Sequence, residues 1–315
     1  MLAISNRTAE HQTINRKYYT MKHYIILLTY LLLSNLSFAQ TYDGLQKLDH
    51  LKQNVYFSKN EKERAIKILD NVAKAETYFE KEFGVHPTYT LLVLSPADWK
   101  KFAHPNAIYG IPHNPDGKTI IVASENNDFW KRITPPIDKI SALLSEKLKN
   151  AYTDQNGKVT LTDFFDLLAV HELGHVFQKE AGLNAQRNWL NELLCNVLLH
   201  TFIAENQPKL LPALTAFPSV TVASFPADKL KYTKLQDFET NYQDIAQHYP
   251  DNYGWYQCRF HTFAGKIYDN GGVAAMNSLW TTLLNEKEKL NDQDLMNLLT
   301  NSNPALKQAL VDWDE

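Results

Sequence analysis

One apolar segment, residues 166–182 with the sequence DLLAVHELGHVFQKEAG, constrains the fold more than any other part of the chain. Its apolar residues run almost without interruption, which predicts a helix that is buried over most of its surface. Two histidines, His171 and His175, and the glutamate Glu172 stand within this helix. Polar side chains in a dry setting need partners. A second element is therefore expected to bring matching groups to this helix.

The spacing of the two histidines indicates a metal site. Residues four apart on a helix lie on one face, one turn apart, so both imidazoles can reach a single ion. Glu172 lies about 100° round the helix from His171, which places its carboxylate beside the ion, where it can contact a metal-bound water. The alternative is a pair of core or surface histidines on an amphipathic helix, since the chain contains 11 histidines.

Glu192, within NWLNELLCNVLLH at 188–200, is the candidate third ligand. A catalytic zinc takes three protein ligands and keeps one position open for water. A second helix, antiparallel to the first and joined to it by a short turn, would bring this carboxylate across. Leucines flank Glu192, so it lies near an apolar face and needs a partner; the alternative is a solvated helix glutamate. We expect His171, His175 and Glu192 to bind one Zn²⁺ per chain.

The motifs HELGH at 171–175 and NWLNELLCN at 188–196 resemble the gluzincin zinc metallopeptidases, the thermolysin- and aminopeptidase-like clan with a peptidase MA-like domain. The resemblance covers residues 165–200 well and residues up to 272 weakly. It implies that Glu172 is the general base. It also implies that Asn196 orients a ligand histidine, at the position where thermolysin-like enzymes carry an aspartate.

The same resemblance implies a mechanism. Zinc lowers the pKa of its bound water and polarises the substrate carbonyl, while Glu172 takes the water proton and passes it to the leaving amine. Aminopeptidase-type gluzincins stabilise the oxyanion with a tyrosine from a later helix. Tyr256 is the first candidate, with Tyr253 the second and His261 the third. The strand KTIIVAS at 118–124 is expected to hold a peptide as an added strand. The G-x-M-E-N signature of aminopeptidases is absent.

The N-terminal sequence predicts an exported protein. Residues 21–40, MKHYIILLTYLLLSNLSFAQ, contain a short basic start, an apolar core and a small-x-small cleavage site at 37–39. The apolar run is too short for a comfortable membrane span, and an uncleaved anchor is the alternative. We interpret residues 1–20 as a misassigned extension and 21–39 as a signal peptide. The mature protein is then periplasmic or secreted, with no stable membrane span.

Composition and patterning predict the fold class. The 315 residues are 44% hydrophobic, which is enough for a sizeable core, and the net charge of −3 with no basic face argues against nucleic-acid binding. Ser58 and Glu61 match a capping box before a helix, and two buried strands follow, at 88–95 and 118–124. From residue 136 onward the pattern is mostly helical, except for 206–250, which contains five prolines and is interpreted as irregular.

We therefore expect an α+β fold in one metallopeptidase-like domain, residues 40–315. A small mixed β-sheet with helices would form the front, 40–135, and a mainly helical lobe would form the rest, 136–315. The zinc site would lie between them, as in a metzincin- or gluzincin-like catalytic domain.

The expected function is that of an exported zinc-dependent metallopeptidase, acting on peptide or protein substrates. Two alternatives stay open: a non-catalytic zinc-containing module that binds a peptide or surface partner, and a zinc hydrolase of a non-peptide substrate. In the binding module Glu172 would be dispensable. Cys195 and Cys258 form either a disulfide or two buried free thiols. Substrate specificity and oligomeric state do not follow from the sequence.

Overall fold

The computed structural model describes residues 41–49, 52–225 and 227–313. The predicted extension at 1–20 and the predicted signal peptide at 21–39 lie outside these residues. The described residues from Gly44 onward belong to one compact unit. Across the described segments, no helix combines the length and the apolar character needed to cross a membrane.

This compact unit contains a four-stranded mixed sheet in the order β1-β2-β3-β4. Its strands are β1 (Gln46–Leu48), β2 (Asn54–Phe57), β3 (Thr90–Leu94) and β4 (Thr119–Ala123). β1 is antiparallel to β2, whereas β2, β3 and β4 are parallel to one another. β3 and β4 are apolar and buried along almost their whole length, as expected for parallel strands that are covered on both faces.

Helices make up most of the rest of this unit. Three belong to the front part: α2 (Lys62–Phe83), α3 (Pro96–Phe102) and α4 (Asp128–Ile133). The C-terminal part contains α5 (Ala142–Tyr152), α6 (Thr162–Glu180), α7 (Asn188–Asn206), α8 (Leu211–Ser224), α9 (Leu235–His248), α10 (Pro250–Asn285), α11 (Asp292–Ser302) and α12 (Pro304–Asp312), with short 3₁₀ turns at Pro208–Leu210 and Ala227–Lys229. This confirms the predicted α+β class with a small mixed sheet.

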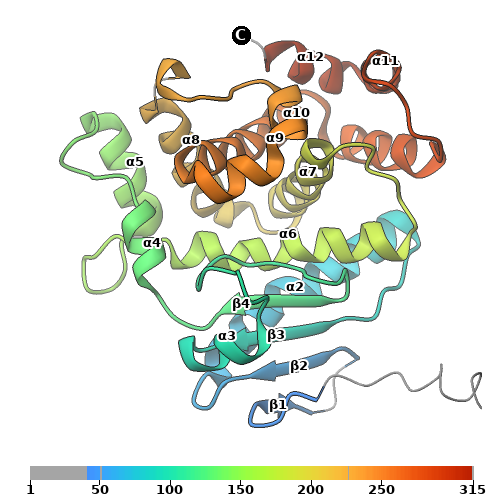
Figure 1. Cartoon of the computed structure of the whole chain (residues 1–315). Helices are drawn as coiled ribbons and strands as arrows, with labels where there is room; N and C mark the ends of the chain where they lie inside the picture. Colours follow the sequence, from blue (N-terminus) through green and yellow to red (C-terminus); the bar gives the residue numbers. More distant parts are fainter. Residues whose placement is uncertain (1–40, 50–51, 226, 314–315) are drawn as a thin grey trace, which may run out of the picture. The chain divides into compact units, whose positions relative to one another are not determined.

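Helix α6 is the centre of this arrangement. It contacts α2 and β4 on one side and α7 and α8 on the other, so it runs between the sheet and the helical part of the chain (Figure 1). A helix covered from both sides must be apolar round most of its circumference. This explains why the segment that carries His171 and His175 shows so few exposed polar positions.

Two predicted features were wrong. α2 begins at Lys62 without a side-chain cap, because the Ser58 hydroxyl donates to Asp98 Oδ2 at 2.7 Å and accepts the Ser95 amide at 2.8 Å. The stretch 206–250 is mostly helical and includes α8 and α9. Its prolines suggested irregular structure, but three of them, Pro208, Pro212 and Pro250, occupy first helical turns, where no amide hydrogen is needed, and Pro218 is accommodated inside helix α8.

Candidate metal centre

The two histidines of α6 face a single carboxylate on α7. His171 Nε2 lies 3.4 Å from one Glu192 oxygen, and His175 Nε2 lies 3.9 Å from the other. His171 is buried, at 6% exposure, whereas the His175 and Glu192 side chains keep 19% and 16% of their surface exposed. The three predicted ligands therefore lie together, with one carboxylate bridging the imidazole nitrogens of the pair.

The protonation states of this cluster suit metal binding. Burial alone would raise the pKa of Glu192, but His171, His175 and the Gln257 amide hold it at about 2. Burial, helped by the charge of His171, lowers the pKa of His175 to about 4. For His171, burial acts downward but the neighbouring Glu192 and Glu172 carboxylates raise the pKa overall. An ionised carboxylate and a neutral imidazole are the forms that bind a cation, and His171 would release its proton on binding.

Glu172 stands beside the cluster rather than in it. Its side chain is buried, and burial together with the Glu192 charge raises its pKa to about 7, against the opposing effect of His171. A carboxyl with a pKa near neutrality exchanges protons most effectively at neutral pH. The predicted role of general base requires a proton affinity of this kind.

Asn196 contacts the ligand histidine as predicted for an orienting residue. Its Oδ1 lies 3.0 Å from His171 Nδ1 and accepts a hydrogen bond from that nitrogen. With its proton on Nδ1, His171 presents a free lone pair on Nε2, toward Glu192. Asn196 is fully buried in α7, so this orientation is built into the helix contact.

A second possible ligand set consists of His171, His175 and Cys195, whose donor atoms lie within 4.8 Å of one another. The Cys195 sulfur lies 3.3 Å from His175, at Nδ1 rather than Nε2. Because Asn196 occupies Nδ1 of His171, only Nε2 of that ring is free. Glu192 instead meets Nε2 of both rings, each through a different oxygen. The predicted set is therefore the one in which both imidazoles present Nε2 to one carboxylate.

Cys195 and Cys258 are both buried free thiols. Of the two states left open by the sequence, the structure shows the two buried free thiols, and no disulfide links α7 to α10.

Tyr256, the first candidate for oxyanion stabilisation, lies outside the cluster. Its hydroxyl donates to the Lys234 carbonyl at 2.8 Å, and its ring stacks on Trp313 with 6.3 Å between the centroids. The side chain is fully buried in this aromatic contact. The assignment of Tyr256 to the site is thus corrected: this tyrosine packs α10 against the C-terminal residues.

Tyr253, on the same helix, lies close enough to the cluster for the charges of its carboxylates to act on the Tyr253 hydroxyl. Burial raises its pKa well above the usual value, and Tyr242, Glu192 and Glu172 add to the shift. Its hydroxyl hydrogen-bonds to that of Tyr242, whose own pKa is raised to about 12 by burial and by the same two carboxylates. Tyr242 belongs to α9, and no sequence signal pointed to it, because this region was interpreted as irregular.

His261, the third candidate, also borders the cluster. Its ring centroid lies 6.4 Å from that of His171, and burial lowers its pKa well below the usual value. A neutral imidazole at this place can hydrogen-bond to a substrate but brings no charge.

Among the described residues, two buried amide atoms beside the cluster lack a hydrogen-bond partner, Asn114 Oδ1 and Asn196 Nδ2. The Gln257 side chain lies close enough to Glu192 to lower its pKa. Asn114 donates through Nδ2 to the Glu172 carbonyl at 3.3 Å. Buried polar groups are normally satisfied, so these unpaired atoms are exceptions beside the cluster.

The free edge of β4, which was predicted to bind a peptide, is partly covered by the segment around His113. Ile121 in β4 exchanges two hydrogen bonds with His113, at 3.1 and 3.0 Å, in addition to its pairing with β3. The segment around His113 therefore lies outside β4, and its neighbour Asn114 reaches Glu172. An added peptide strand would meet this segment before it met β4.

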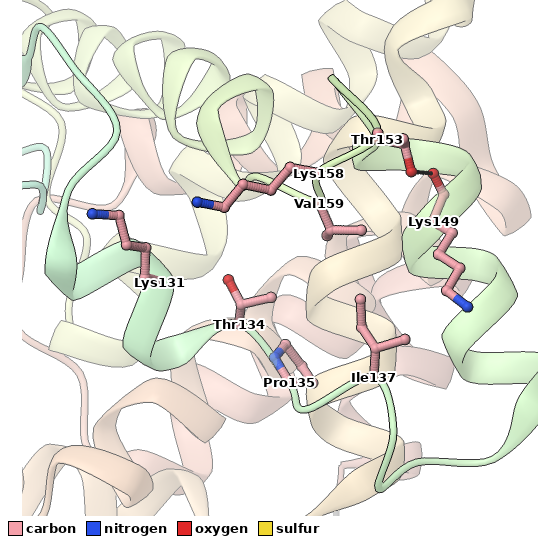
Figure 2. Close-up of a pocket in the computed structure, with 9 residues that line it drawn as sticks. Lys131, Thr134, Pro135, Ile137, Lys149, Thr153, Lys158 and Val159 are labelled. Atoms are coloured by element: carbon pink, nitrogen blue, oxygen red, sulfur yellow. Dashed lines mark hydrogen bonds between the residues drawn. The ribbon is translucent and has the colours of Figure 1, made fainter. Parts of the chain in front are cut away.

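A hollow of about 660 Å³ lies in a different part of the molecule (Figure 2). Its lining includes none of the cluster residues and consists of Lys131, Thr134, Pro135, Ile137, Lys149, Thr153, Gly157, Lys158 and Val159. Its three lysines are exposed, and the Lys149 side chain points away from the other two. The hollow therefore has no convergent set of polar groups.

No protein-family model matches this chain, and no curated protein sequence matches it. The function has to be inferred from the residues of the cluster themselves.

Proposed function

We propose that this chain is an exported zinc-dependent metallopeptidase of gluzincin type. It binds one Zn²⁺ through His171, His175 and Glu192 and hydrolyses peptide bonds with Glu172 as general base. The observation that carries the proposal is the convergence of two imidazole Nε2 atoms on one carboxylate, with a buried glutamate beside them. Two histidines and one carboxylate are a donor set of catalytic zinc, which keeps one position for water.

The surrounding residues have separate tasks in this mechanism. When bound, zinc supplies an activated water and polarises the carbonyl of the substrate. Glu172 takes a proton at its carboxylate and returns it to the leaving amine, a role that matches its pKa of about 7. Asn196 holds the His171 ring through Nδ1. Tyr253 donates a hydrogen bond to the substrate oxygen as that oxygen gains negative charge.

The state of Glu172 favours catalysis over a module that only binds. In a module that only binds, a buried carboxyl near a second carboxylate would cost desolvation free energy without contributing to function. The position of α6 between the sheet and the helical part supports a zinc site between these two parts of the fold.

The first experiment is the zinc content of the purified protein beside two variants. Glu192→Ala removes the proposed ligand, and Glu205→Ala removes an exposed glutamate from the same helix as a matched control. We expect about one zinc in the wild type and in the control, and a sharp reduction in Glu192→Ala. A wild type that takes up no zinc on reconstitution would refute the proposal. Zinc-loaded protein would then be screened against peptide and non-peptide substrates.

A further inference from the structure

The proposed mechanism assigns no hydrogen-bond partner to Nδ1 of His175. In the structure the Cys195 sulfur lies beside that nitrogen. The two atoms are 3.3 Å apart. Cys195 belongs to α7, next to Asn196, and its side chain is completely buried. A thiol in this position either binds the metal or acts through the histidine.

The sulfur is held from two further sides. Gln178, one turn after His175 on α6, donates its Nε2 hydrogen to the sulfur at 3.1 Å. Gly174 lies opposite, and a Cβ built there would come within 2.9 Å of the sulfur and 3.3 Å of the Cys195 Cα. α6 and α7 therefore approach so closely at this point that glycine is needed. The thiol therefore lies in the narrow contact between the two helices.

The direction of the hydrogen bond follows from the metal-bound tautomer. If Nε2 of His175 binds the ion, Nδ1 carries a hydrogen and requires an acceptor. Asn191 also approaches Nδ1, at 3.4 Å, but it does so with its Nδ2, which is a donor. The Cys195 sulfur is then the acceptor at this place. The same geometry argues against Cys195 as a ligand, since His175 would have to turn Nε2 away from Glu192.

We propose that Cys195 is a positioning residue whose sulfur accepts the Nδ1 hydrogen of His175 and so aims Nε2 at the zinc. This inference rests on the proposed function. It makes the two histidines equivalent: each donates through Nδ1 to one of two adjacent residues of α7, His171 to Asn196 and His175 to Cys195. Partners of this kind are typically worth 10- to 100-fold in metal affinity.

The test measures zinc affinity by competition with a chromophoric chelator, for wild type, Cys195→Ala, Cys195→Ser and Cys258→Ala. We expect Cys195→Ala to bind zinc about 10- to 100-fold more weakly. Cys195→Ser keeps an acceptor and should recover part of the loss. Cys258→Ala removes the other buried thiol, on α10, and should bind zinc like the wild type. Unfolding of the metal-free variants separates loss of packing from loss of affinity.

A Co²⁺-substituted sample separates positioning from direct ligation. A thiolate ligand gives Co²⁺ an intense near-ultraviolet charge-transfer band, whereas imidazole and carboxylate ligands do not. We expect no such band in the wild type. A band that vanishes in Cys195→Ser would make Cys195 a ligand and overturn the proposal, as would an unchanged zinc affinity in Cys195→Ala. A wild type that binds neither metal would refute the proposed function as well, whereas normal binding in both Ala variants would refute only the role of Cys195.

Discussion

Helix α6 buries a carboxyl on each of two sides, and the two carboxyls have different partners. Toward α2, Asp166 pairs with the Arg64 guanidinium and lies 3.2 Å from the Lys67 ammonium. Toward α7, Glu172 has no ion pair with Lys or Arg among the described residues, and a second carboxylate, Glu192, lies nearby. Both acids are less than 10% exposed, at 2% and 7%.

The difference separates a structural acid from a reactive one. Burial raises the pKa of both carboxyls. At Asp166 the charges of Arg64 and Lys67 oppose that shift, whereas at Glu172 the charge of Glu192 adds to it. A buried acid with cationic partners ties two helices together. A buried acid placed near another acid reduces stability, and such groups concentrate at functional sites.

The strongest test of this contrast is Glu172→Gln. We expect the zinc content to stay at the wild-type value while kcat on a peptide substrate falls by about 10²- to 10⁴-fold, because the general base is lost. Zinc analysis and steady-state kinetics on the same preparation check this. Hydrolysis at the wild-type rate would show that Glu172 is not the base.

Asp166→Asn should act on stability instead. Loss of the charge leaves Arg64 buried without its partner, which costs about 3–5 kcal/mol. Asp163→Asn is the control, because Asp163 pairs with Lys67 at the surface, where a pair contributes about 0–1 kcal/mol. Urea unfolding of the metal-free proteins gives both values. Equal stability of the two variants would show that the α2 side of α6 is not held by this pair.

The same contrast recurs on α10, where Tyr253 lies near the cluster and Tyr256 lies in the aromatic core. Tyr253→Phe should lower kcat by about 10²- to 10³-fold, the effect of removing one oxyanion donor. Tyr256→Phe should leave kcat unchanged and lower the free energy of unfolding by about 1 kcal/mol, through the lost bond to the Lys234 carbonyl. A large loss of kcat in Tyr256→Phe together with an unchanged kcat in Tyr253→Phe would return Tyr256 to the site.

The pH dependence of stability gives the last comparison. The pKa of Glu172 is about 7 in the fold and 4.5 as its ordinary value, so the folded chain binds more protons between these limits. Stability of the metal-free protein should therefore fall as pH rises from 4.5 through 7, by about 3 kcal/mol from this group. Glu172→Gln should remove that decline. The free energy of unfolding is measured against pH by urea unfolding for both proteins. The same decline in both would contradict the assignment of this pH dependence to Glu172.

Local spacing determined much of the site. Two histidines four apart on an apolar helix must share a face whatever surrounds them, and Glu192 on a leucine-rich helix needed a polar partner. For this reason α6, α7 and the cluster of His171, His175 and Glu192 could be predicted without the structure. Two of the three parallel strands, β3 and β4, were also predicted, since their apolar runs are local.

Tertiary structure alone decided which neighbour each helix face meets. Tyr253 and Tyr256 are three residues apart, and only the packing of Trp313 against α10 shows that the second belongs to the core. Tyr242 lies on α9, in a region that the sequence pattern predicted to be irregular, and the Ser58 hydroxyl bonds to Asp98 instead of capping α2. These outcomes depend on contacts between residues far apart in the chain, whose free energies exceed the local preferences that a sequence pattern records.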